Sequence, residues 1–196
     1  MNNLRFRSFI LAFSFLFFLF TAVGCGSDDI SKNTPPTNTS SPNGAETQTP
    51  EPSTSVNKTM DVTLYFPTPD ASGLVATKRT LKVTEETSVA AIKEIFKEFT
   101  NPPTGSVAPL PEKTELLDVK IKDGVATLDL SKSFRENFKG GTTGEEMVLY
   151  SIVNTLTTLP DVQSVEFLLE GELKAAILGG LDTSVPVEPD ESLILK

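Results

Sequence analysis

The apolar residues of this 196-residue chain fall into three blocks, and their distribution decides which part of the chain can fold. Residues 1–24 contain 16 apolar residues, residues 25–60 contain only 5, and residues 61–196 contain the remaining 54. The middle block is rich in Ser, Thr and Pro, and it has too few apolar side chains to repay the entropy of ordering. We therefore expect a single folded domain, residues 61–196, which follows a leader and a disordered tether, residues 25–60.

The leader, residues 1–24, has the features of a bacterial export signal. Two arginines precede an apolar run from Phe9 to Val23, which is shorter than the roughly 20 residues that span a membrane. The run ends in Ala22-Val23-Gly24-Cys25, which resembles the lipobox of lipoprotein precursors, where the Cys is lipidated and becomes the first mature residue. We predict a lipoprotein signal peptide, a membrane anchor on Cys25, and a location on the outer face of the cytoplasmic membrane. An uncleaved anchor helix is the alternative, and it also places the rest of the chain outside the cytoplasm.

The composition excludes several classes of function. The chain has 26 acidic and 17 basic residues, a formal net charge of −9, and lacks the basic stripe that nucleic-acid binding needs. It contains no His and one Cys, so nucleophile systems that use His and zinc sites with nitrogen or sulfur ligands are excluded. We therefore predict no cofactor, no metal site and no nucleic-acid partner.

The hydrophobic pattern of residues 61–196 changes between a period of two and a period of about 3.6. It predicts strands over 61–66, 74–84, 115–122, 125–130 and 165–169, and helices over 88–99 and 142–159. Asp123-Gly124 is a two-residue turn signal that joins the third and fourth strands as a hairpin. The order β-β-α-β-β-α-β predicts an α+β fold with a mixed, largely antiparallel sheet and two helices on one of its faces.

Two local features carry further structural predictions. Thr142 and Thr143 each have a Glu three residues later, so either can form a capping box at the start of the second helix. Arg79 shares the parity of the apolar residues in its strand, so either a bulge turns it outward or a carboxylate draws it inward. We predict that it forms a structural ion pair with Asp129.

Acidic residues are the remaining candidates for catalysis. They occur in pairs that general acid and base chemistry could use, namely Glu145/Glu146, Glu166/Glu170 and Asp118/Asp129. Glycoside hydrolysis needs two carboxyls about 5–10 Å apart across a cleft, and the sequence predicts no such cleft. A carboxylate hydrolase is therefore the least favoured function, and we predict that the protein is not an enzyme.

One face of the second predicted helix carries an uncharged polar stripe. Ser151, Asn154, Thr155 and Thr158 follow one another at helical spacing without a charge among them, although the domain is acidic. The stripe has a structural interpretation, in which the hydroxyls bond to carbonyls of the preceding turn and Asn154 fastens a neighbouring loop. It also has a functional one, a protein contact surface that avoids burying charge, and on this interpretation the four residues are the predicted interface.

Several segments together resemble the GerMN domain of spore-germination and sporulation lipoproteins. The heptapeptide Ser-Ile-Val-Asn-Thr-Leu-Thr at residues 151–157 is the most specific of them. The others are residues 61–66, Leu74-Val75 with Arg79, Leu110-Pro111 with Thr114, residues 125–131 with Phe134, and residues 165–167 with Glu170-Gly171. The module occurs in tandem in the family's germination protein, whereas only one repeat is found here, and the family's Gly-Pro is replaced by Asn101-Pro102-Pro103.

The resemblance implies a domain that is similar to ring-building-motif modules and works by protein contact rather than catalysis. We therefore predict a lipid-anchored extracytoplasmic interaction or scaffold protein of the bacterial envelope, with a role in sporulation or germination. Its partner would be an envelope protein or a second copy of itself. The alternative is a module that binds a cell-wall polymer or a small ligand, which an apolar pocket with Tyr65 or Tyr150 at its rim would favour.

Overall fold

The computed structural model describes residues 58–196, and the predicted signal peptide, the predicted lipidation site Cys25 and nearly all of the predicted tether lie outside the described residues. The elements follow one another in the order β1 (Lys58–Pro67), β2 (Leu74–Val83), α1 (Ser88–Glu98), β3 (Leu116–Lys122), β4 (Val125–Leu130), α2 (Ser133–Glu136), α3 (Thr142–Leu156), β5 (Ser164–Leu169) and β6 (Glu172–Leu173), before a single 3-10 turn, Glu191–Leu193. The α+β class is confirmed, and the predicted order is present with α2 and β6 added. The first strand begins at Lys58, three residues before the predicted start of the domain.

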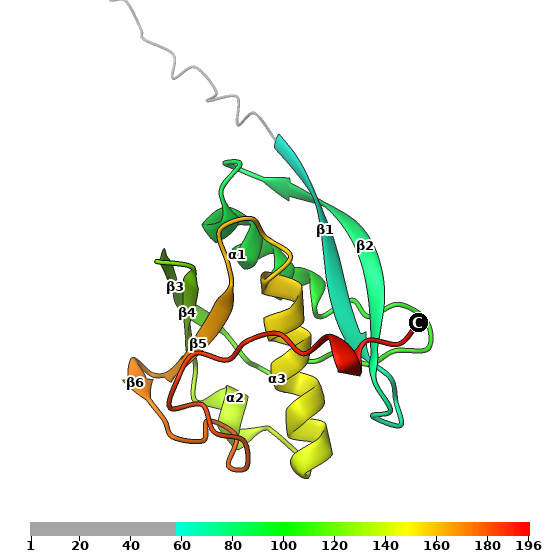
Figure 1. Cartoon of the computed structure of the whole chain (residues 1–196), viewed down its shortest axis with the longest axis vertical. Helices are drawn as coiled ribbons and strands as arrows, with labels where there is room; N and C mark the ends of the chain where they lie inside the picture. Colours follow the sequence, from blue (N-terminus) through cyan, green and yellow to red (C-terminus); the bar gives the residue numbers. More distant parts are fainter. Residues whose placement is uncertain (1–57) are drawn as a thin grey trace, which may run out of the picture. The chain divides into compact units, whose positions relative to one another are not determined.

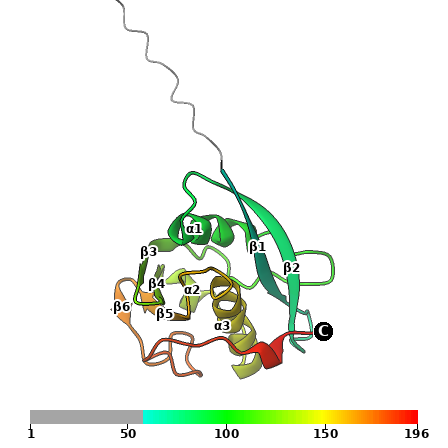
Figure 2. The ribbon, with the colours of Figure 1, turned by 45° about the horizontal axis from the view of Figure 1, so that its top comes forward.

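The strands form two sheets rather than one. β1 and β2 make an antiparallel two-stranded sheet, and the other four strands are arranged in the order β3-β4-β5-β6. In the larger sheet only β4 and β5 run parallel, with α2 and α3 between them in the sequence. Figure 1 shows α1 and α3 between the two sheets, and the turned view in Figure 2 shows the same arrangement.

The alternating strands and the amphipathic first helix form as the sequence predicts. Val62, Leu64 and Phe66 are buried along β1, and Ala126, Leu128 and Leu130 are buried along β4. The hydroxyl of Thr87 accepts the Ala90 N–H and caps α1. Asp123 and Gly124 both have positive φ, as a two-residue turn of this hairpin type requires.

The hydrophobic core lies between the sheets and is built from both of them and from the two longer helices. Its largest fully buried side chains include Phe66 of β1, Phe167 of β5 and Ile152 of α3, together with Phe99, which follows α1. Phe66 and Phe99 pack edge to face with ring centroids 5.9 Å apart. Residues 51–196 form one compact unit, which contains this core.

The last residues of the chain cross α3 and connect the two sheets; we call residues 187–195 the strap (Figure 1). Val187 and Val165 of β5 exchange two backbone hydrogen bonds of 2.9 and 2.8 Å, and the Leu195 N–H donates to the Leu74 carbonyl at the start of β2. Because the strap is fixed at both sheets, it covers the side of α3 that neither sheet covers.

Candidate interaction site

The polar stripe on α3 is mostly inside the protein. Ser151, Asn154 and Thr155 are buried, with exposed fractions of 0%, 3% and 0%, and only Thr158, which lies just beyond the helix, is exposed. The prediction that all four residues present a contact surface is therefore wrong for the first three. The cause is the position of α3, because a sheet packs on each side of the helix and the strap crosses it.

Asn154 fastens the strap to α3, as the structural interpretation of the stripe expects. Its amide Nδ2 donates to the Asp190 carbonyl at 2.8 Å, and its Oδ1 accepts the Asp190 N–H at 2.9 Å. The side chain thus pairs with both backbone groups of one extended residue, in the manner of a neighbouring strand. Burial raises the pKa of the nearby Tyr150 phenol, and the negative charges of Asp190 and Glu146 raise it further.

Thr155 and Ser151 lie on the same helix but differ in their contacts. The Thr155 hydroxyl accepts the Tyr65 N–H of β1 at 2.9 Å, so it takes the place of a strand partner at the outer edge of β1. The Ser151 hydroxyl is buried and has no hydrogen-bond partner among residues 58–196. Thr155 therefore provides a hydrogen-bond acceptor for the backbone of β1, whereas Ser151 is a small side chain that fills space.

The predicted ion pair between Arg79 and Asp129 does not form. The Arg79 Nε lies 3.6 Å from the Glu98 carboxylate, and its guanidinium donates to the Asn101 carbonyl at 3.4 Å. Asp129 instead accepts the Gly171 N–H at 2.7 Å. The two residues belong to different sheets that the helices separate, whereas Glu98 is at the end of the helix that packs beside β2.

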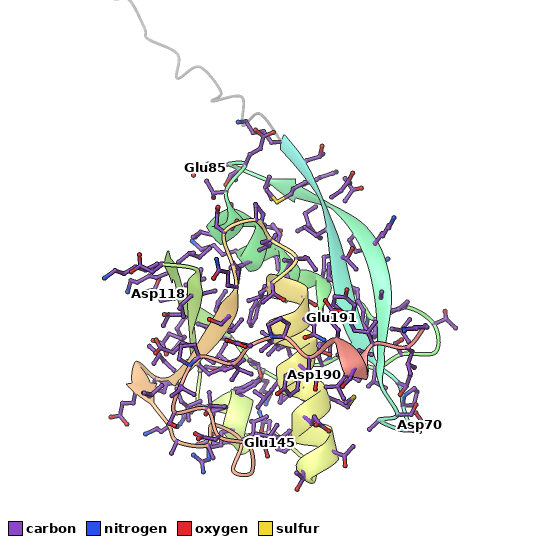
Figure 3. The ribbon with its side chains drawn as sticks, viewed as in Figure 1. Asp70, Glu85, Asp118, Glu145, Asp190 and Glu191 are labelled. Carbon is purple, nitrogen blue, oxygen red and sulfur yellow. The ribbon has the colours of Figure 1, made fainter. Side chains whose placement is uncertain are left out.

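The carboxylates considered for catalysis hold the backbone in place. Glu145 is buried in the first turn of α3 and accepts the N–H groups of Gly180 and Leu181 at 3.1 and 3.0 Å (Figure 3). A Cβ on Gly180 would lie 2.5 Å from the Glu145 Oε2, so a larger residue there would have to displace the carboxylate that holds this loop. The predicted capping boxes are wrong, since Gly141 is the N-cap and no side chain of the described residues caps the helix.

Two more of the acidic candidates also have structural partners. Glu166 accepts the Thr127 hydroxyl at 3.1 Å, and Glu170 accepts the Lys132 N–H at 2.7 Å. Within residues 58–196, no three His, Cys, Asp or Glu residues are grouped so that they could hold a metal ion. No helix in this part of the chain combines the length and the apolar character needed to cross a membrane.

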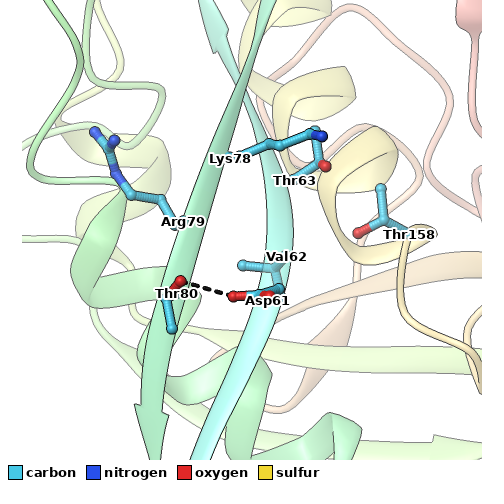
Figure 4. A pocket seen from close by; sticks show the side chains of 7 residues that line it. All are labelled: Asp61, Val62, Thr63, Lys78, Arg79, Thr80 and Thr158. Atoms are coloured by element: carbon cyan, nitrogen blue, oxygen red, sulfur yellow. Dashed lines mark hydrogen bonds between the residues drawn. The ribbon is translucent and has the colours of Figure 1, made fainter.

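The only exposed member of the stripe, Thr158, lines a polar pocket of about 460 Å³ beside the β1–β2 hairpin (Figure 4). The other lining residues are Asp61, Val62, Thr63, Lys78, Arg79 and Thr80. Asp61 accepts the Thr80 hydroxyl at 2.6 Å, which orients both side chains at the pocket surface. Among residues 58–196, no carboxylate forms a salt bridge with Lys78, so its ammonium group is available to a partner.

Two larger hollows besides a small one beside α1 lie elsewhere on the described surface. One, of about 330 Å³, is lined mainly by apolar side chains, including Pro69, Val107 and Phe138, next to the start of α3. The other is a groove of about 770 Å³ between α1 and the edge strand β3. Tyr65 and Tyr150 line none of these three hollows, so the condition that would favour the ligand-binding alternative is not met at them.

A family comparison matches this fold. Residues 63–175, more than half of the chain, match the Germane family model, which is described as "Sporulation and spore germination". The matched segment begins inside β1 and ends just after β6, so it contains most of the smaller sheet, the whole larger sheet and the three α-helices of the described residues. A comparison with curated proteins finds no match.

Solved structures give the same architecture. The tandem GerMN domains of the sporulation protein GerM from Bacillus subtilis match with 25% identity and a TM-score of 0.54, over 67% of this chain and 46% of that one. This chain therefore spans about half of the tandem protein. The first GerMN domain of GerM alone matches with 20% identity and a TM-score of 0.51, over 68% and 98%. A protein from Clostridium perfringens, described as a candidate lipoprotein, matches with 27% identity and a TM-score of 0.48, over 66% and 87%.

Proposed function

Because this chain belongs to the Germane family of sporulation and spore-germination domains, we propose that it is a lipid-anchored interaction protein of the bacterial envelope. On this proposal it acts outside the cytoplasm, in sporulation or germination, by protein contact and without catalysis. The family match carries the proposal, since it extends across both sheets of the folded unit. The absence of His and the structural roles of Glu145, Glu166 and Glu170 support the non-catalytic part.

The membrane anchor is tested at Cys25. Metabolic labelling with a fatty-acid analogue should mark the wild-type protein, because the Ala22-Val23-Gly24-Cys25 segment resembles a lipobox. The Cys25→Ser variant should lose the label and either leave the membrane fraction or accumulate as precursor. An unlabelled wild-type protein in labelled cells would refute the anchor.

The polar pocket beside the hairpin is the first surface to test for a protein partner. It offers the Lys78 ammonium group, which has no carboxylate partner among residues 58–196, and the exposed side chain of Thr158, whose hydroxyl donates to the Thr155 carbonyl at 2.7 Å and can still accept. The other charges of the domain are mostly negative. We expect Thr158→Glu and Lys78→Glu to reduce the recovery of a partner that is crosslinked in the native envelope, because both changes place negative charge in the pocket. Thr104→Glu, an exposed change outside this pocket, is the matched control.

The outcome of this test separates the two candidate functions. All three variants should keep the wild-type unfolding transition, since the changed side chains are exposed. Equal recovery of the partner with every variant would show that the partner does not bind at the polar pocket. A rise in the melting temperature with soluble muropeptides, combined with no protein partner, would favour the cell-wall polymer alternative.

A further inference from the structure

The larger sheet has an open edge at β3, where backbone groups point away from the sheet. β3 lies first in the order β3-β4-β5-β6 and, among residues 58–196, pairs only with β4. Lys122 and Val125 flank the two-residue turn, so they form a hydrogen-bonded pair. Hydrogen-bonded and non-hydrogen-bonded pairs then alternate along the antiparallel ladder of β3 and β4. It follows that Val119 and Ile121 direct their N–H and C=O groups outward.

Side chains at this edge are partly apolar and partly charged. Leu117 is 47% exposed and lies at the irregularity between Leu116 and Asp118, next to the groove whose lining includes Phe96. The Asp118 carboxylate accepts the Val119 N–H at 2.9 Å and lies 2.6 Å from the Lys120 ammonium group. Figure 3 shows Asp118 at the outer side of β3. Bulges and charged side chains on an edge strand commonly prevent other strands from pairing with it. A strand that pairs with β3 must therefore fit the irregularity and carry charges opposite to those of Asp118 and Lys120.

A second copy of the same strand matches this edge. The sequence Leu117-Asp118-Val119-Lys120-Ile121 is self-complementary about its middle residue when the two strands run antiparallel. Asp118 of one copy then lies opposite Lys120 of the other, and Leu117 lies opposite Ile121. Opposite charges in direct cross-strand positions stabilise a pair, and like charges destabilise it.

We propose that β3 pairs antiparallel with β3 of a second copy, centred on Val119, so that the two four-stranded sheets become one continuous sheet. This inference names a second copy as one partner of the interaction protein, and to that extent it rests on the proposed function. In the pair, the Val119 N–H leaves the Asp118 carboxylate and donates to the carbonyl of the opposite Val119. The carboxylate then reaches Lys120 of the second copy, so its charge stays paired.

The pair should be weak. It adds only the outward groups of Val119, those of Ile121 opposite Leu117 of the other copy, and a narrow band of side chains. One hydrogen bond within each copy is given up for it. An interface of this size belongs with the transient ones, so we expect a dissociation constant between about 1 µM and 1 mM.

The experiment uses residues 51–196, which form a compact unit of their own and contain no Cys. Sedimentation equilibrium up to about 1 mM should show a monomer and a dimer. Asp118→Lys and Lys120→Asp should each weaken the dimer by about tenfold, because each change places like charges opposite one another twice. The double variant Asp118→Lys/Lys120→Asp should restore the wild-type constant. Both side chains are more than half exposed, so the monomer should stay folded by circular dichroism.

A crosslinking experiment tests the register even where a charge variant misfolds. Asp118→Cys and Lys120→Cys proteins, mixed under oxidising conditions, should give a disulfide-linked heterodimer faster than either protein gives a homodimer, because only the mixed pair lies directly opposite. A monomer at every concentration, a dimer that does not respond to the charge changes, or homodimers that form as fast as the heterodimer would overturn the proposal. None of these results bears on Cys25 labelling or on the polar pocket, so the proposed function stands or fails separately.

Discussion

Truncating Asn154 should loosen the strap and lower the stability of the whole domain. The side chain is 3% exposed, and it makes both of its hydrogen bonds with the backbone of Asp190. Asn154→Ala removes both bonds and leaves a small cavity beside α3. The strap then keeps only its end contacts, at Val187 and Leu195.

The expected loss follows from these contacts. Each of the two hydrogen bonds contributes about 1 kcal/mol net, and Asp190 is half-buried, so water can replace part of what its backbone loses. The cavity left by the amide adds up to about 1 kcal/mol. We therefore expect Asn154→Ala to lower the free energy of unfolding by about 2–3 kcal/mol, which corresponds to about 6–12 °C in Tm for a domain of this size.

Urea unfolding of residues 51–196 measures the free energy, and amide hydrogen exchange shows where the structure opens. The N–H groups of Asp190 and Leu195 should exchange faster in Asn154→Ala than in the wild type. Ser151→Ala is the matched control, since it removes a buried hydroxyl without a partner and should change the free energy of unfolding by less than about 0.5 kcal/mol. A loss below about 0.5 kcal/mol for Asn154→Ala, with unchanged exchange, would show that the amide does not hold the strap.

Three further predictions concern other contacts of α3. Gly180→Ala should lower the free energy of unfolding by about 1–3 kcal/mol in urea, since the new Cβ would lie 2.5 Å from the Glu145 carboxylate; wild-type stability would show that the loop has room. Thr155→Val should lower it by about 1–2 kcal/mol, because the Tyr65 N–H loses its acceptor, and equal urea midpoints would contradict this. The Tyr150 pKa is raised in the folded state, so the unfolded chain releases the phenol proton first and stability should fall as pH rises above about 10. Tyr150→Phe should make this alkaline decline shallower, and an identical decline would exclude the phenol as its source.

Local pattern was sufficient to predict most of the elements. The alternation of Val62, Leu64 and Phe66 gives a strand with one buried face, and this holds whichever layer covers that face. The Asp123-Gly124 turn fixes the β3–β4 hairpin through backbone conformations that few other residue pairs adopt. These features depend on neighbours in the sequence, so a sequence is enough to predict them.

The sheet arrangement and the ion pair depend on contacts between segments that are distant in the sequence. The local hydrophobic pattern carries no information about which distant segments come into contact. Parity along the strand correctly marks Arg79 as facing the helices, but parity does not say which carboxylate is nearest. Glu98 lies at the end of α1 beside β2, whereas Asp129 belongs to the other sheet. A one-sheet arrangement made Asp129 a reasonable partner, and the division into two sheets removed it.

The polar stripe shows why an uncharged helix face is ambiguous. A helix with one covered side exposes the other side to water, and exposed positions usually carry charge. The second half of α3 has a sheet on each side and the strap across it, which favours small, uncharged polar side chains there, most of them with hydrogen-bond partners. Asn154 and Thr155 meet this need by binding the backbone of the strap and of β1. The missing charges therefore indicate that α3 is buried on all sides over residues 151–156, and partner contacts are to be sought at Thr158 and at the open edge of β3.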